Sequence, residues 1–139
     1  MKIGYTAGVF DLFHIGHVNL LRNASSHVDK LIVGVTVDEL VSYKNKQAVI
    51  PFHERIEVVR SCRYVDIAVP QTSIDKVEAV KKFNADFLFV GDDWFQSETW
   101  DHMQEELDKL ECKVTYFPYT EGTSSTLVNN VLESLRSED

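Results

Sequence analysis

Cysteine is scarce in this sequence, and its two cysteines, Cys62 and Cys112, form neither a CxxC motif nor a disulfide framework. Cys62 falls in a helical pattern and Cys112 opens an expected strand, so we expect both to be small buried thiols. Long apolar runs are also missing, because none approaches the roughly 18 residues that a membrane-spanning helix needs. Met1 and Lys2 lead directly into a strand pattern without a signal peptide. We therefore expect a cytoplasmic protein with no membrane partner.

Positive charge is in deficit, with 14 Lys and Arg against 22 Asp and Glu and a net charge of −8. This balance argues against broad nucleic-acid binding, which needs a basic surface. It still permits a small anionic ligand, because a few focused cations can outweigh a distant acidic surface. The hydrophobic content of 44% and charged content of 26% are typical of a globular protein. A chain of 139 residues predicts one domain over 1–139, since it is too short for two.

Strand patterns alternate with helical patterns along the whole chain. The expected strands are 2–8, 31–37, 66–70, 86–91 and 113–118, and the expected helices are 14–27, 51–62, 73–84, 98–110 and 125–136. The run 31–37 is continuously apolar, as in a strand covered on both faces. The alternation predicts an α/β protein, with a Rossmann-like five-stranded parallel sheet and helices on both faces. Ligands of such sheets bind beyond the carboxyl ends of the strands, which directs attention to 8–17, 38–46, 91–94 and 118–126.

Two histidines open the first expected helix. His14 and His17 are three residues apart, so they lie on one helix face, and Gly16 between them lets a ligand approach the backbone. The N–H groups and dipole of a first helical turn favour an anion. The pattern predicts a phosphate site with two imidazole donors. A zinc site is the alternative, but HxxH lacks the glutamate and the i, i+4 spacing of the zincin helix.

The segment GVFDLFHIGH at 8–17 resembles the signature of the HxGH nucleotidylyltransferases, and FDLFHIGH is close to the cytidylyltransferase branch. The resemblance implies that a substrate phosphate attacks the α-phosphorus of a nucleoside triphosphate in line, without a covalent enzyme intermediate. It implies that His14 and His17 hold phosphate oxygens as negative charge develops. It also implies that Val9 and Phe10 offer backbone N–H groups, although family members often have threonine at position 9. Asp11 either lies near the phosphates or caps the turn.

Cations follow the second expected strand, 31–37, and the expected helix 51–62. Alone, Lys44 and Lys46 in SYKNKQAV are typical of a solvated loop, but the family places a phosphate-binding lysine here, and Lys46 is the better candidate. Arg63 lies in RYVD, which resembles a family segment near the dimer contact and the active site of relatives of the glycerol-3-phosphate type. Arg63 is either a phosphate ligand or a helix-terminal cation favoured by the dipole. The same resemblance implies a homodimer.

Gly91, Asp92, Asp93 and Trp94 follow the most apolar expected strand. Adjacent carboxylates at a strand exit are costly unless they are solvated or engaged, which indicates nucleobase recognition, with an oxygen accepting from the cytosine amino group. GDDW closely resembles the version in glycerol-3-phosphate cytidylyltransferases. Trp94 either closes the pocket edge or packs in the core.

The segment YTEGTSST at 119–126 precedes the last expected helix. Hydroxyls and backbone N–H groups at a helix start make a second anion site, although either serine alone is an ordinary N-cap. The segment resembles the family motif RTxGxST, with Tyr119 in place of the arginine, and the resemblance assigns nucleotide contacts to Tyr119, Thr120, Ser124 and Ser125. Tyr119 either binds the β and γ phosphates of the nucleotide more weakly than the family arginine would or faces the acceptor substrate.

Taken together, these motifs predict a cytidylyltransferase that uses CTP and a small phosphorylated alcohol such as glycerol 3-phosphate. Magnesium is expected to accompany the triphosphate and offset its charge, with no metal site on the protein itself. One alternative is an adenylyltransferase of the same fold, which uses ATP with a sugar-phosphate or other phosphorylated acceptor. The other is a non-catalytic domain that binds a nucleotide and regulates another process, and the loss of the arginine at 119 is its only support.

Overall fold

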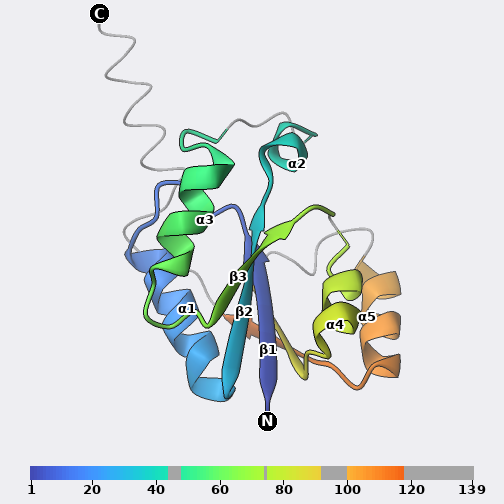
Figure 1. The fold of residues 1–139 in the computed structure, drawn as a ribbon. Helices are drawn as coiled ribbons and strands as arrows, with labels where there is room; N and C mark the ends of the chain where they lie inside the picture. Colours follow the sequence, from blue (N-terminus) through green and yellow to red (C-terminus); the bar gives the residue numbers. More distant parts are fainter. Residues whose placement is uncertain (44–47, 74, 92–99, 118–139) are drawn as a thin grey trace, which may run out of the picture.

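The fold is a parallel α/β sheet, seen in a computed structural model that describes residues 1–43, 48–73, 75–91 and 100–117 (Figure 1). Its strands are β1 Ile3–Gly8, β2 Lys30–Thr36, β3 Ile67–Gln71, β4 Phe87–Gly91 and β5 Lys113–Phe117. Every neighbouring pair is parallel, and the spatial order is β3-β2-β1-β4-β5. The described helices are α1 Ile15–His27, α2 Asp38–Tyr43, α3 Phe52–Arg60, α4 Val77–Phe83 and α5 Trp100–Lys109. The predicted five-stranded parallel sheet is confirmed.

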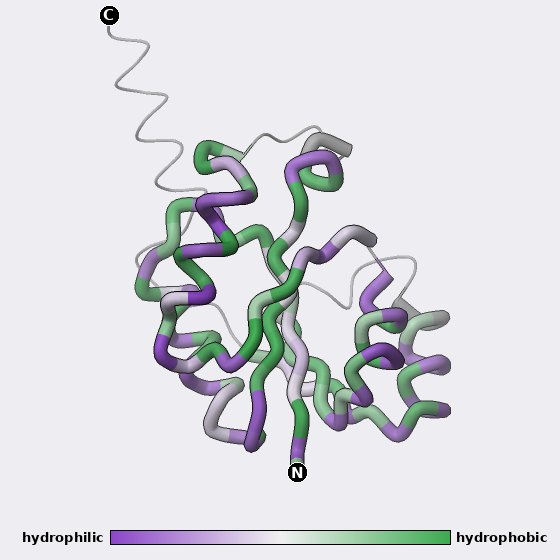
Figure 2. The backbone as a smooth tube through the Cα atoms, viewed as in Figure 1, coloured by the Kyte–Doolittle hydropathy of each residue, from purple (hydrophilic) through white to green (hydrophobic). Residues whose placement is uncertain are grey.

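The two faces of the sheet carry separate apolar clusters because neighbouring side chains on a strand point to opposite faces. Leu31, Val33 and Val35 of β2 pack with residues of α1 and α3 on one face. Ile32 lies on the other face, in a cluster that includes Leu88 of β4 and residues of α4 and α5. Helices α1 and α3 accordingly cover one side of the sheet, and α4 and α5 cover the other (Figure 1). The central strands are mainly apolar, whereas hydrophilic segments gather in helices and turns (Figure 2).

The sheet order creates a topological switch beside β1. The chain builds β2 and then β3 on one side of β1 and continues with β4 and β5 on its other side. The connections after β1 and β4 therefore leave the sheet in opposite directions, and parallel α/β sheets bind ligands beyond the carboxyl ends of the strands at such a switch point. The residues that follow β1 are the predicted phosphate-binding segment 8–17.

The expected elements match the observed ones within a few residues, with two corrections. The helix expected at 51–62 begins after Pro51, which is its N-cap, and ends at Arg60, so Cys62 lies in the following turn and is only half-buried. Cys112 is buried as expected. The six-residue helix α2 is not among the expected helices, since the sequence analysis treats 38–46 only as a segment that follows a strand. The helix expected at 125–136 lies outside the described residues.

Of the five described helices, none is both long enough and apolar enough to cross a membrane.

Candidate active site

The turn between β1 and α1 is held in an unusual backbone conformation. Phe10 and Leu12 have φ angles of 55° and 53°, in the left-handed region that residues other than glycine rarely adopt. Such residues persist only where the surrounding structure holds them, and they concentrate at functional sites. The Phe10 side chain is buried among the residues that pack on α1 and α3. The left-handed residues reverse the chain so that α1 starts at the carboxyl end of β1.

His14 and His17 fold against each other at the start of α1. His14 is the N-cap, and its Nδ1 accepts a hydrogen bond from the Gly16 N–H at 3.0 Å. His17 returns the contact, because its Nδ1 accepts from the His14 N–H at 3.2 Å. The two rings stack with centroids 4.0 Å apart. This reciprocal cap brings the two sequence-predicted histidines together on the first turn.

The cap also determines the protonation of the two rings. A nitrogen that accepts a hydrogen bond carries no proton, so each neutral imidazole bears its proton on Nε2. Burial, and then the neighbouring His14, lower the pKa of His17 to about 4, against a smaller opposing effect of Asp11. Burial also lowers the pKa of His14. Near neutral pH the pair therefore consists of two neutral imidazoles that donate through Nε2–H.

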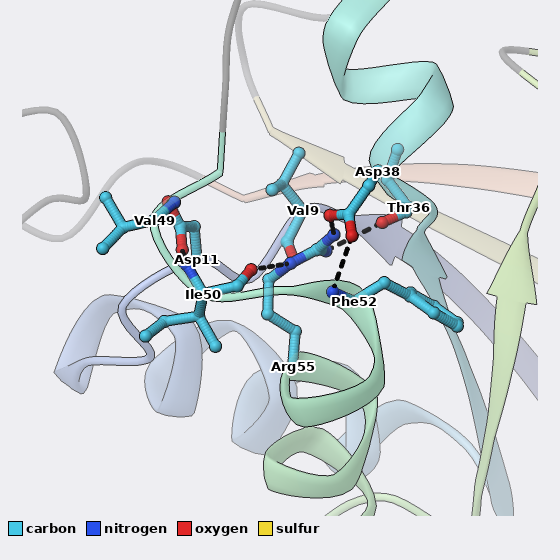
Figure 3. A network of polar contacts seen from close by, with 8 residues as sticks. All are labelled: Val9, Asp11, Thr36, Asp38, Val49, Ile50, Phe52 and Arg55. Atoms are coloured by element: carbon cyan, nitrogen blue, oxygen red, sulfur yellow. Dashed lines mark hydrogen bonds and ion pairs between the residues drawn. The ribbon is translucent and has the colours of Figure 1, made fainter.

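Asp11 ties the turn to the segment before α3. Its two carboxylate oxygens accept hydrogen bonds from the backbone N–H groups of Val49 and Ile50, at 2.9 and 3.0 Å (Figure 3). The side chain is buried, with 6% of its surface exposed. The carboxylate thus links the β1 exit to the residues that follow 44–47.

Arg55 is a second connection, and the sequence analysis did not identify it. Its guanidinium donates to the carbonyl oxygens of Ile50 (2.8 Å), Val9 (2.8 Å) and Thr36 (2.7 Å), and to Asp38 Oδ1 at 2.6 Å (Figure 3). The side chain is 1% exposed. One signal was available: Arg55 falls three residues after Phe52 and four before Val59, on the apolar stripe of α3. A charged residue in an apolar stripe indicates a buried polar network.

Asp38 completes this network from α2. Its Oδ2 accepts from the Phe52 N–H at 3.0 Å while Oδ1 accepts from Arg55. The Phe52 hydrogen bond and the Arg55 contact lower the pKa of Asp38, against a smaller opposing effect of burial. Arg55 and Asp38 therefore connect three segments, which are the β1 exit, the β2 exit and the start of α3.

The remaining predicted residues are distributed as follows. Val9 contributes its carbonyl to Arg55, and Gly91 ends β4, the neighbour of β1 across the switch. Arg63 lies in the turn before β3, at the amino end of that strand, so within the chain it is not brought to the histidine pair, which follows the carboxyl end of β1. Arg63 lies over the Tyr64 ring, 5.4 Å from its centroid. The predicted contacts Lys44, Lys46, Asp92, Asp93, Tyr119, Thr120, Ser124 and Ser125, and Trp94 beside them, lie outside the described residues.

His27 has a packing role. Its ring stacks on Phe117 and Phe89, with centroids 5.7 and 5.9 Å away.

Comparison with known proteins assigns the family. The family model described as cytidylyltransferase-like matches residues 5–133. A glycerol-3-phosphate cytidylyltransferase of Staphylococcus aureus is 36% identical over 135 residues, covering 95% of this chain and 96% of that protein. An FAD synthase of Thermococcus kodakarensis is 33% identical over 134 residues, covering 92% of this chain and 87% of that protein.

The fold has solved counterparts. The crystal structure of a lipopolysaccharide core biosynthesis protein from Thermoplasma volcanium superposes with a TM-score of 0.72 at 22% identity, covering 88% of this chain and 99% of that one. At this identity the likeness concerns the fold alone. The sequence comparisons show that the chain belongs to the cytidylyltransferase-like family and is a nucleotidyltransferase.

Proposed function

We propose that this enzyme transfers CMP from CTP to a small phosphorylated alcohol, such as glycerol 3-phosphate, and releases pyrophosphate. The observation that carries the proposal is the capped histidine pair, which offers two Nε2–H donors at a helix start beside the sheet switch. The choice of glycerol 3-phosphate as acceptor is based on the name of the S. aureus relative, which matches nearly the full length of the chain. The motif GDDW at 91–94 favours CTP as the donor.

In this mechanism an oxygen of the acceptor phosphate attacks the α-phosphorus of CTP. A new oxygen–phosphorus bond forms, the bond from the α-phosphorus to the bridging oxygen breaks, and pyrophosphate leaves with that electron pair. His14 and His17 stabilise the charge that grows on the phosphate oxygens, because fixed donors need no reorganisation as the reaction proceeds. The start of α1 adds the positive end of the helix dipole. No side chain acts as a nucleophile.

Magnesium is proposed as the companion of the triphosphate. Mg²⁺ retains several waters and is commonly held through substrate phosphates, whose charge it offsets. Within 1–43, 48–73, 75–91 and 100–117 no group of three or more His, Cys, Asp or Glu side chains is placed to hold a metal. We assign no residue of the chain to the ion.

A second candidate is adenylyl transfer from ATP to a phosphorylated acceptor. The relative named FAD synthase, at 33% identity, favours it. The same histidine pair would serve this reaction, because the chemistry at the α-phosphorus does not depend on the base.

A pyrophosphate-release assay separates these candidates. CTP and ATP are each combined with glycerol 3-phosphate, other phosphorylated alcohols, sugar phosphates and flavin mononucleotide, in the presence of magnesium. We expect release with CTP and a polyol phosphate, and calorimetric titration should show tighter binding of CTP than of ATP. Release only with ATP would replace the proposal by the second candidate, and nucleotide binding without release would indicate a regulatory domain.

A further inference from the structure

Arg55 occupies a position where stability alone does not call for a charge. It lies in the apolar stripe of α3, close to the buried residues Ile56 and Val59. A buried guanidinium loses its hydration, which is costly unless the group is paired and hydrogen-bonded, and only the Arg55 side of this ion pair is buried, since the Asp38 side chain is 46% exposed. The four acceptors that surround Arg55 offset the lost hydration. What these acceptors have in common is their location, because all four belong to segments that enter or leave the predicted phosphate-binding edge.

The contact with Val9 reaches the phosphate-binding turn through one peptide group. The Val9 carbonyl and the Phe10 N–H belong to the same planar trans peptide, in which the two groups point in opposite directions. When Arg55 Nη1 holds the carbonyl at 2.8 Å, it therefore also sets the direction of the Phe10 N–H. Within the described part of the chain this N–H has no hydrogen-bond acceptor, and it is one of the two backbone donors that the family resemblance assigns to the nucleotide.

The peptide between Val9 and Phe10 needs contacts from other segments to keep its orientation, because Phe10 has a strained backbone. Phe10 has a φ of 55°, and a non-glycine residue relaxes from that region unless its surroundings prevent it. Two contacts restrain the turn from outside: Arg55 at the Val9 carbonyl and Asp11 at the Val49 and Ile50 amides.

Asp38 holds the guanidinium in its place. One carboxylate oxygen accepts from Arg55 and the other from the Phe52 N–H, so both oxygens are needed. The carboxylate also joins α2 to the start of α3, the two helices on either side of 44–47. One ion pair thus connects the β1 exit with the residues that flank the predicted lysines.

We propose that Arg55 is a positioning residue of the transfer reaction, which aims the Phe10 N–H at the reacting phosphate, and that Asp38 fixes Arg55 for this purpose. Arg55 acts through the backbone and does not touch the substrate. The proposal rests on the proposed function for its reaction, but the coupling from Asp38 to Phe10 can be measured without any nucleotide.

The test uses Asp38→Asn, with Glu57→Gln as a matched control. Asparagine has one acceptor oxygen where the site needs two, so either the Arg55 contact or the Phe52 contact breaks. The control makes the same charge change at the partner of an exposed arginine of α3, Arg60, away from the strand exits. Asp38→Asn should lower kcat by about 10-fold to 10²-fold, the scale for a misplaced donor, and leave the KM for CTP within about twofold. Glu57→Gln should leave both constants unchanged.

Amide NMR of the nucleotide-free protein gives the independent readout. Because Arg55 polarises the Val9 carbonyl, the Phe10 amide resonance should shift and broaden in Asp38→Asn and stay in place in Glu57→Gln. An unmoved Phe10 resonance, or a kcat equal to that of the control, would overturn the proposal. So would a lower Tm with normal turnover per folded molecule, which would indicate a structural role only.

A second variant tests the same proposal, and failure of the proposed function can be told apart from failure of the coupling. Arg55→Lys retains the charge but cannot reach all four acceptors, so it should lose more turnover than Asp38→Asn. A smaller loss of turnover in folded Arg55→Lys would contradict the proposal. If Arg55→Lys does not fold, the result for Asp38→Asn decides. A wild-type enzyme that never releases pyrophosphate from CTP would remove the proposed function, whereas the Phe10 resonance would still test the coupling.

Discussion

A histidine at an N-cap is uncommon, because Asn, Asp, Ser and Thr are preferred there. His14 nevertheless caps α1 with Nδ1, which leaves Nε2 as the donor, and His17 does the same at the third helical position. Each ring therefore has a structural nitrogen and a donor nitrogen. Alanine at either position would remove both functions at once and would not distinguish them.

His14→Asn and His17→Gln separate capping from catalysis. Asparagine is a strong N-cap, and glutamine is a normal partner at the third position of a capping box, so both variants retain an acceptor for the backbone. We expect each variant to lower kcat by about 10²–10³, because the lost donor acts mainly on the charge of the transition state. CTP affinity and Tm should change little. Near-normal turnover in both variants would contradict the histidine site.

The protonation of His17 predicts a stability that depends on pH. Its folded-state pKa is lowered to about 4 from an ordinary value of 6.5, mainly by burial. The unfolded chain then binds more protons than the folded one between these two values, so stability falls as pH drops from 6.5 to about 4. Tm measured across this range should decline more steeply for the wild type than for His17→Gln. Parallel declines in the two proteins would show that other groups cause the acid sensitivity.

At the scale of the elements, Gly34 of β2 leaves room for a side-chain pair that joins β1 to β3. The Tyr5 hydroxyl donates to Gln71 Oε1 beneath this glycine, and a Cβ at position 34 would collide with that pair. The pair crosses from β1 to β3, and the Gln71 amide continues to the Ser73 carbonyl at 2.5 Å. Burial raises the pKa of Tyr5, so its hydroxyl stays protonated and can donate.

Gly34→Ala should therefore destabilise the fold by about 1–3 kcal/mol, the usual cost of overpacking. Tyr5→Phe removes the hydroxyl that obstructs the new methyl group. The double variant should consequently be more stable than the sum of the two single effects predicts, by about 0.5–3 kcal/mol. Denaturant unfolding of the four proteins measures this coupling, and strictly additive effects would contradict the close packing of Tyr5 beneath Gly34.

The elements that the sequence predicted well are those whose signal is periodic. The buried strands and helix α1 have continuous apolar runs or three-residue spacing, so their bounds agree within one or two residues. Helix α2 was missed because six residues carry too little periodicity. The Asp38–Arg55 network was missed because it depends on which strand exits lie together, and that follows from the sheet order and not from the spacing of residues.

The candidate site was predictable in part. The positions of His14 and His17 followed from spacing, but the reciprocal cap that sets their protons needed coordinates. Arg63 was predicted from a motif, and its place at the amino end of β3 could not be inferred without the fold. The predictions for Lys44 and Lys46, for 92–94 and for 119–126 stay predictions, because these residues lie outside the described part of the chain.

At the scale of the whole molecule, the segment RYVD at 63–66 bears on assembly. Arg63 is exposed above Tyr64, whereas the Asp66 carboxylate accepts from the Leu31 N–H at 2.7 Å and so belongs to the join between β2 and β3. Ile67 follows at the start of an edge strand with 37% of its surface exposed. An exposed cation, an aromatic ring and an apolar side chain therefore lie along one edge of the sheet.

We predict a homodimer that uses this edge, because a chain of 139 residues buries a limited core of its own and gains stability from a symmetric contact. Light scattering at micromolar concentration should give twice the chain mass of 15.9 kDa. Ile67→Lys should shift the protein to the monomer, since lysine on an edge strand opposes pairing with a second copy. Leu110→Lys is the matched control, because Leu110 is also 37% exposed but lies between α5 and β5, the strand at the other edge of the sheet. A wild-type monomer would contradict the dimer, and dissociation by Leu110→Lys in place of Ile67→Lys would move the contact to the other side of the molecule.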